Sequence, residues 1–159
     1  MELNDSYGYR DNLNYGIIGN CQSSALIHKD SSIDWCCLPR FDSPSIFGKI
    51  IDNKIGGFFK IEPIGNYNVK QEYFKTTSIL KTSFNNGFDK FEVIDYMPRY
   101  QLKKNNYYSP PEISRIVRLV NGNPQIKIIY DPKLDYSLGE SKSYLKDDFI
   151  VTVSENDNY

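Results

Sequence analysis

The sequence predicts an all-β protein, built as an antiparallel β-sandwich with one short helix. Tyr and Phe are abundant, with 13 and 9 copies, and aromatic residues suit pleated sheets better than helices. Short runs of β-branched and aromatic residues also recur along the chain, separated by Asn, Gly, Asp and Pro. A chain of 159 residues is long enough for one domain with one core.

The first predicted strands form a hairpin. Residues 24–28 and 32–38 flank Lys29-Asp30-Ser31, whose short polar side chains can bond their own backbone and close a turn. A third strand is expected at residues 57–62. It ends at Pro63, because proline cannot donate to a sheet ladder.

The clearest local signal is a second hairpin that joins residues 78–84 to residues 88–96. Between them stands Asn85-Asn86-Gly87, and these residue types tolerate the positive φ of a tight turn. Residues 90–93 alternate between charged and apolar side chains. One face of this strand is therefore expected to meet water.

The last third of the chain predicts a third hairpin and a final strand. Residues 113–120 and 126–130 are separated by the turn sequence Asn121-Gly122-Asn123-Pro124. Residues 149–153 alternate as a strand does. Residues 100–111, rich in Lys, Asn, Tyr and Pro, show no periodicity and are expected to form a long surface loop.

A short helix is expected only at residues 43–51. Ser43 would be its cap and Pro44 would occupy its first turn. Regularly spaced strands with turn-rich connections otherwise favour a sandwich over alternating βαβ units.

Charge and composition exclude several partner classes. The formal net charge is −1 and no basic stripe is present, so nucleic acid is not an expected partner. No apolar run has the length of a membrane span, and the start carries no signal-peptide pattern. Cys21, Cys36 and Cys37 form an odd set that favours reduced thiols over disulfides. We therefore expect a soluble, cytoplasmic protein.

Few residues point to catalysis, a metal or a cofactor. His28 is the single histidine and is interpreted as structural, because a triad needs partners that converge on it. Cys36 and Cys37, adjacent on one strand, point to opposite faces and are expected to be buried, inert thiols rather than zinc ligands. We predict no metal site and no cofactor.

Acidic residues allow one enzymatic alternative, since a glycosidase needs two carboxyl groups across a sugar. The sequence places no two acids at that separation, and we interpret them as turn caps and strand-end or surface charges. Exposed tyrosines in the loop at 100–111 would be able to stack on a sugar ring. The acids considered are Asp34, Asp42, Asp95 and Glu112, and the tyrosines are Tyr107 and Tyr108.

Residues 15–27 and 30–44 closely resemble the start of glucoamylase-like and trehalase-like proteins of glycoside hydrolase family 15. The similarity includes Trp35 and the stretch Leu38-Pro39-Arg40-Phe41-Asp42. It extends in the same order through residues 56–58, 95–99, 115–118, 132 and 135–136. Gln22-Ser23 and Ser31 depart from the family's pattern, and the loss of a glycine at Ser31 bears on the turn geometry rather than on the fold.

The resemblance implies an amino-terminal, mutarotase-like supersandwich that precedes an (α/α)6 barrel with both catalytic glutamates. Residues 1–14 would be an extension and residues 15–159 a single sandwich domain, truncated before the barrel. The family reaction is inverting hydrolysis of an α-glucosidic bond in glucoamylases or trehalases. We therefore expect a non-catalytic accessory domain whose partners are the barrel and, at a shared site, an α-glucan or trehalose.

Within this resemblance, one segment is the candidate for docking on the barrel or bordering the glucan site. Its residues are Trp35, Pro39, Arg40, Phe41 and Asp42. The alternative is structural: Trp35, Leu38 and Phe41 would supply core packing, and Arg40 would pair with Asp42.

Two further functions remain open at this stage. A sandwich without its last strands exposes an edge, so the chain is alternatively a stand-alone sugar-binding or self-associating module, for example a homodimer. A mutarotase-like enzyme is the third reading, and the single histidine counts against it.

Overall fold

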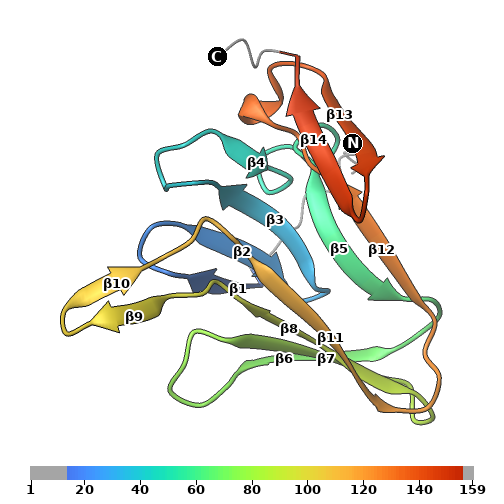
Figure 1. Cartoon of the computed structure of the whole chain (residues 1–159). Helices are drawn as coiled ribbons and strands as arrows, with labels where there is room; N and C mark the ends of the chain where they lie inside the picture. The colour runs from blue at the N-terminus through green and yellow to red at the C-terminus, as the bar shows by residue number, and fades with distance from the viewer. Residues whose placement is uncertain (1–13, 156–159) are drawn as a thin grey trace, which may run out of the picture.

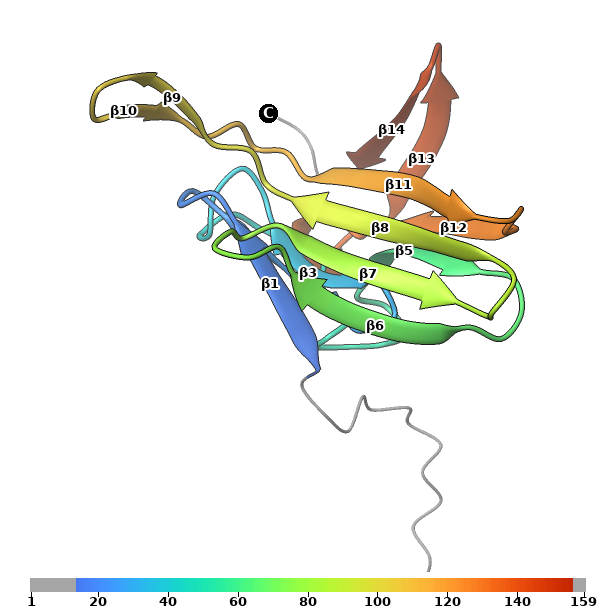
Figure 2. The ribbon, with the colours of Figure 1, turned by 90° about the horizontal axis from the view of Figure 1, so that it is seen from below.

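The computed structural model describes residues 14–155, and these form two antiparallel sheets packed face to face (Figures 1 and 2). The predicted extension at residues 1–14 falls outside this range except for Asn14. The six-stranded sheet has the order β1-β2-β3-β5-β12, with β4 paired to β3. Its strands are β1 (Tyr15–Gly19), β2 (Ser24–His28), β3 (Ser32–Cys37), β4 (Ser45–Phe47), β5 (Phe58–Pro63) and β12 (Ile126–Asp131).

The second sheet has four strands in the order β11-β8-β7-β6. Its strands are β6 (Asn68–Tyr73), β7 (Leu80–Asn85), β8 (Lys90–Tyr96) and β11 (Ser114–Asn121). Two separate two-stranded ribbons complete the described fold, and a single 3₁₀ turn spans Asp135–Ser137. The ribbons are β9 (Tyr100–Lys103) with β10 (Asn106–Tyr108), and β13 (Ser141–Lys146) with β14 (Phe149–Ser154).

The core lies between the two sheets and confirms the predicted sandwich. Phe84 and Phe91 stack with ring centroids 4.7 Å apart, and both side chains are buried beside Ile61. A neighbouring cluster of buried aliphatic side chains centres on Ile18, Ile27 and Ile33. At about 25 cal/mol per Å² of apolar surface removed from water, these two clusters supply the main drive for closing the sandwich.

The first two predicted hairpins and the strand ending at Pro63 are confirmed. β2 pairs with β3, and β7 pairs with β8. At the second hairpin, Gly87 adopts a φ of 96° and its N–H donates to the side chain of Asn85. Glu92 lies on the face of β8 that was predicted to meet water. It is buried there, however, because Arg118 and Lys81 pair with it.

The predicted third hairpin is wrong: β11 and β12 do not pair with each other. β11 pairs with β8 and β12 pairs with β5, so the turn between them carries the chain from one sheet to the other. Gly122 has a φ of 77°, and a Cβ there would lie 2.1 Å from the Asp89 carboxylate. A glycine is required here for close packing against the β7–β8 hairpin rather than for a hairpin of its own.

The predicted helix at residues 43–51 is also wrong. Residues Ser45–Phe47 form β4, whose Phe47 pairs with Cys36 and enters the core. The chain then turns at Gly48, whose carbonyl accepts from the N–H groups of Ile51 and Asp52. Burial of Phe47 against β3 outweighs the local helix signal of Ser43 and Pro44, since tertiary packing routinely overrides propensity.

The predicted loop at residues 100–111 contains the β9–β10 ribbon, which projects from the body of the sandwich (Figure 2). A register irregularity between Asn106 and Tyr107 hides the period-two pattern of this ribbon. Strands β1, β6 and β13 were likewise not predicted as strands. β1 contains two glycines among its five residues, and β6 and β13 are mostly polar without clean alternation.

One side of the sandwich leaves core-facing side chains uncovered. Val117 and Leu119 are register partners of buried Val93 and Phe91, so they lie on the core-facing side of β11. Ile128 is the partner of buried Ile61 on β12. Leu119 and Ile128 nevertheless remain 62% and 63% exposed. We call the surface formed by Val117, Leu119, Ile128 and Tyr130 the open side.

Candidate functional site

Three connections gather at one end of the sandwich, on the left of Figures 1 and 2. They are the β1–β2 turn, the β3–β4 loop with the predicted site residues, and the β9–β10 ribbon. We call this surface the loop end and define it by residues 20–23, 39–44 and 99–108. A hydrogen bond at its base joins Asn20 to Pro110, which lie 90 positions apart in the sequence.

Asn20 joins the β1–β2 turn to the base of the β9–β10 ribbon. Its side-chain amide donates to the carbonyls of Pro110 and Pro98, at 2.9 and 3.3 Å, on either side of the β9–β10 ribbon. Its side-chain oxygen accepts from the N–H groups of Gln22 and Ser23, at 3.1 and 3.2 Å. Asn20 is 2% exposed, and its bonds to Pro98, Pro110 and Ser23 are buried. The geometry of the loop end is therefore fixed from within.

The β3–β4 loop is fastened to the same turn. The backbone N–H of Phe41 donates to the carbonyl of Gln22 at 3.1 Å, and the Ser23 hydroxyl donates to the Cys37 carbonyl. The Leu38–Pro39 peptide bond is cis. This loop thus lies beside the β1–β2 turn and presents its side chains outward.

Arg40 and Asp42 form the local ion pair that the sequence predicted. Arg40 Nε lies 2.9 Å from Asp42 Oδ1, and a second guanidinium nitrogen lies 3.0 Å from Oδ2. The hydrogen bond from Arg40 lowers the pKa of Asp42. Because both side chains are well exposed, the pair is a planar, charged feature of the surface and contributes little stability.

The other predicted site residues have different environments. Phe41 is 61% exposed, so the expected core role for Phe41 is wrong. Pro39 is also exposed. Leu38 packs against the core as expected. Trp35 is half-buried within β3, where it pairs with Leu26, and is not part of the β3–β4 loop.

The β9–β10 ribbon adds aromatic side chains that the sequence analysis did not combine with this loop. Tyr100 and Tyr108 stack with ring centroids 6.4 Å apart, and the guanidinium of Arg99 lies 4.1 Å from the centre of the Tyr107 ring. All three tyrosines remain about half exposed. Exposed aromatic and arginine side chains are typical of recognition surfaces.

The acids considered for catalysis lie in separate environments, with different burial and different partners. Asp34 and Asp95 are fully buried. Asp34 accepts from Tyr15 at 2.9 Å and from Ser32 at 2.5 Å, whereas Asp95 is paired with Arg115. Glu112 is exposed. Asp42 does not suit a general acid, since such a group must hold its proton and the pKa of Asp42 is lowered.

The surroundings of His28 and of the two adjacent cysteines suit structural rather than catalytic residues. His28 Nδ1 lies 2.7 Å from Asp30 Oδ1 and its ring meets the Tyr15 ring edge-on. Burial raises the pKa of Cys36 to about 12, with a smaller contribution from Cys37, and burial also raises the pKa of Cys37. Both thiols therefore stay protonated at neutral pH and unreactive.

The residues that connect the two sheets were not identified as a unit from sequence. Arg115 on β11 donates to Asp95 at 2.7 Å, to the carbonyl of Phe59 at 2.8 Å, and to the carbonyl and hydroxyl of Ser31 at 2.6 and 2.8 Å. Its guanidinium also lies 4.7 Å from the centre of the Phe59 ring. This buried cluster ties the β2–β3 turn and β5 to the opposite sheet.

No helix in the described part of the chain has the length and apolar character needed to cross a membrane. Among residues 14–155, no group of three or more His, Cys, Asp or Glu side chains is arranged to hold a metal ion.

A family model for the trehalase-like N-terminal domain matches residues 13–157. Trehalase 2 of Sulfolobus acidocaldarius is 32% identical over 139 residues, which cover 87% of this chain and 22% of that protein. The trehalase of Thermoplasma volcanium is 32% identical over 154 residues, covering 93% of this chain and 24% of the relative. The trehalase of Mycolicibacterium smegmatis is 28% identical, over 77% of this chain and 20% of that protein.

This chain therefore spans about a quarter of the length of the trehalases it matches. No solved structure matches it significantly. Because the family model covers nearly the whole chain, the similarity applies to the sandwich rather than to a short motif. The chain belongs to the family of trehalase-like N-terminal domains.

Proposed function

We propose that this chain is a non-catalytic accessory domain of an α-glucoside hydrolase of the trehalase or glucoamylase type. Its loop end docks on the catalytic part, an (α/α)6 barrel that carries both catalytic glutamates. There it stabilises the active site or borders it where trehalose or an α-glucan binds. The relatives are trehalases about four times as long, which supports a division of labour between this sandwich and a larger catalytic part.

The observation that carries the proposal is the construction of the loop end. A buried asparagine joins the β1–β2 turn to the base of the β9–β10 ribbon, and the same turn holds the β3–β4 loop. The side chains presented outward include aromatic and charged ones. Sugar-binding and docking surfaces share this combination of a rigid base and exposed rings. The three free cysteines in the described chain also support a reducing, cytoplasmic compartment.

Replacing Arg40 with alanine in the longer enzyme that contains this domain tests the docking role. We expect the melting temperature to stay nearly unchanged, because exposed ion pairs contribute about 1 kcal/mol or less. We expect turnover of trehalose or maltose to fall roughly ten-fold, since a lost interdomain contact worth about 1.4 kcal/mol changes a rate by that factor. Differential scanning fluorimetry and a glucose-release assay measure the two quantities.

The matched control is Lys70→Ala, which removes an exposed ion pair with Glu72 on β6, outside the loop end. It should leave both quantities unchanged. A loss of stability without a specific loss of turnover in Arg40→Ala rejects docking. Glucose release by the purified 159-residue chain would contradict the accessory role itself.

The open side favours a second candidate function, a self-associating module. β11 and β12 are edge strands of the two sheets, and both present uncovered apolar side chains there. Exposed edges and apolar patches favour pairing with another chain. In this form two copies of the chain would cover each other's open sides in a homodimer.

A charge placed on the open side tests whether the chain self-associates there. If the chain dimerises there, Leu119→Lys and Ile128→Lys should each raise the dimer dissociation constant at least ten-fold, because each buries an unpaired ammonium. Analytical ultracentrifugation over a concentration series measures this constant. The control Phe88→Lys changes another highly exposed apolar residue, in the β7–β8 turn. A chain that is monomeric at every concentration excludes the homodimer.

A further inference from the structure

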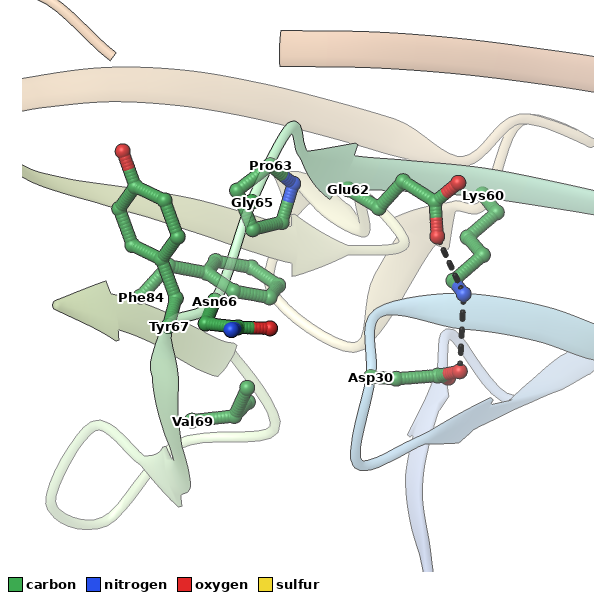
Figure 3. A pocket seen from close by; sticks show the side chains of 9 residues that line it. All are labelled: Asp30, Lys60, Glu62, Pro63, Gly65, Asn66, Tyr67, Val69 and Phe84. Carbon is green, nitrogen blue, oxygen red and sulfur yellow. Dashed lines mark ion pairs between the residues drawn. The ribbon is translucent and has the colours of Figure 1, made fainter. Parts of the chain in front are cut away.

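A pocket lies at the other end of β2 and β3 from the loop end. It opens between the β2–β3 turn and the connection from β5 to β6 and has a volume of about 250 Å³ (Figure 3). Drug-sized ligands occupy pockets of about 300–1,000 Å³, so this one accepts only a smaller molecule. Its lining combines a charged wall with an apolar wall.

The charged wall consists of Asp30, Lys60 and Glu62. Lys60 Nζ lies 3.1 Å from Asp30 Oδ2 and 2.5 Å from Glu62 Oε2. Burial by itself would lower the pKa of Lys60, but the hydrogen bond to Glu62 and the charge of Asp30 outweigh it and raise that pKa. The ammonium therefore stays charged, and the three groups provide one donor and two acceptors side by side (Figure 3).

The apolar wall consists of Tyr67, Phe84 and Val69. The Tyr67 hydroxyl donates to Asp89 at 3.3 Å, and its ring meets the buried Phe91 ring at a centroid distance of 6.1 Å. Both contacts hold the ring in place, so it forms a prepared flat surface. Asn66 lies between this wall and the charged one in Figure 3 and adds an amide.

We propose that this pocket binds one ring of a neutral sugar. A pyranose ring has hydroxyl groups around its edge and an apolar C–H face, which match the Asp30–Lys60–Glu62 wall and the Tyr67 ring respectively. Two carboxylates beside one ammonium leave an excess of negative charge, which disfavours phosphates and other anions. The proposal does not depend on the docking role of the loop end.

Titration of the isotope-labelled chain with glucose and with trehalose, followed by NMR, tests the proposal. We expect saturable shifts of the backbone amides of Gly65 and Asn66. Glu62→Gln should weaken binding about ten-fold, because a hydrogen bond to a charged group is lost. Tyr67→Phe should weaken binding by less than Glu62→Gln does, since it keeps the ring and its contact with Phe91 and removes only the hydroxyl directed at Asp89.

The matched control is Glu72→Gln, which neutralises a carboxylate paired with Lys70 and Lys81 outside the pocket. It should bind as the native chain does. Amide shifts that do not saturate, or that weaken equally in Glu62→Gln and Glu72→Gln, would overturn the proposal. Stronger saturable binding of tetramethylammonium at the same amides would identify a cation site instead.

Discussion

Replacing Arg115 with alanine is expected to lower the free energy of unfolding by about 3–5 kcal/mol, the range for breaking one partner of a buried ion pair. The Arg115 and Asp95 side chains are 3% and 0% exposed, so removing the guanidinium leaves a carboxylate without its charged partner inside the protein. The carbonyl of Phe59 also loses the guanidinium N–H that bonds it. Since a domain of this size has a total stability of about 5–15 kcal/mol, a large share of it would be lost.

Urea denaturation followed by tryptophan fluorescence measures this change, with Trp35 as the single tryptophan. Arg40→Ala is the control, because it removes an arginine from an exposed ion pair. The double variant Arg115→Met with Asp95→Leu should recover most of the loss, since a buried ion pair can be replaced by apolar groups at little cost. An Arg115→Ala protein as stable as the native chain would show that the buried Arg115–Asp95 pair does not stabilise the fold.

The stability that Arg115→Ala loses relative to the native chain should also depend on pH. Burial raises the pKa of Asp95, and the charge and hydrogen bonds of Arg115 oppose that rise. A carboxyl whose pKa is raised by folding stabilises the fold below its unfolded pKa and loses that contribution as the pH rises through its folded pKa. Without Arg115 the pKa of Asp95 rises further, so mild acidification should narrow the stability gap between variant and native chain.

Replacing Asn20 with alanine should cost about 3 kcal/mol and loosen the loop end. The change removes the donor to Pro98 and Pro110 and the acceptor for Gln22 and Ser23, and each buried polar group left unsatisfied costs about 1–3 kcal/mol. Hydrogen exchange should accelerate in residues 99–109 beyond any global change, because the base of the ribbon loses its attachment.

Two further variants locate the origin of this effect. Asn20→Asp keeps the side-chain acceptor but removes the amide donor, so it should loosen the β9–β10 ribbon while leaving the β1–β2 turn protected. Asn123→Ala changes an exposed asparagine in the turn between β11 and β12 and should have no measurable effect. Unaltered exchange of the ribbon in Asn20→Ala would show that Asn20 does not anchor it.

Local turn chemistry allowed much of the fold to be predicted from sequence. The β7–β8 hairpin follows from Asn85-Asn86-Gly87, where a positive φ and a side-chain cap close the turn. The helix prediction failed because Ser43 and Pro44 are local signals, whereas Phe47 is placed by its contacts with β3 and β5. The turn at Gly122 was misjudged for the same reason, since its partner Asp89 lies in another hairpin.

The candidate site was predictable only where its contacts are local. The Arg40–Asp42 pair spans two positions, so sequence analysis found it. Asn20 bonds to Pro98 and Pro110, at separations of 78 and 90 residues, and no local pattern indicates such contacts. The exposure of Phe41 was missed because an aromatic residue beside a core strand is usually buried.

The position of Arg115 also has a consequence for how the chain folds. Its partners Phe59 and Ser31 lie 56 and 84 residues earlier in the chain, on β5 and in the β2–β3 turn of the opposite sheet. While the sheets are still apart, this guanidinium either stays hydrated or is buried without its partners. Burying it without partners costs free energy, because an unpaired charge is taken out of water. We therefore expect Arg115 to reach its final position late in assembly, because an unpartnered guanidinium destabilises intermediates in which the sheets are only partly docked. On this basis we expect the sandwich to unfold in one cooperative transition.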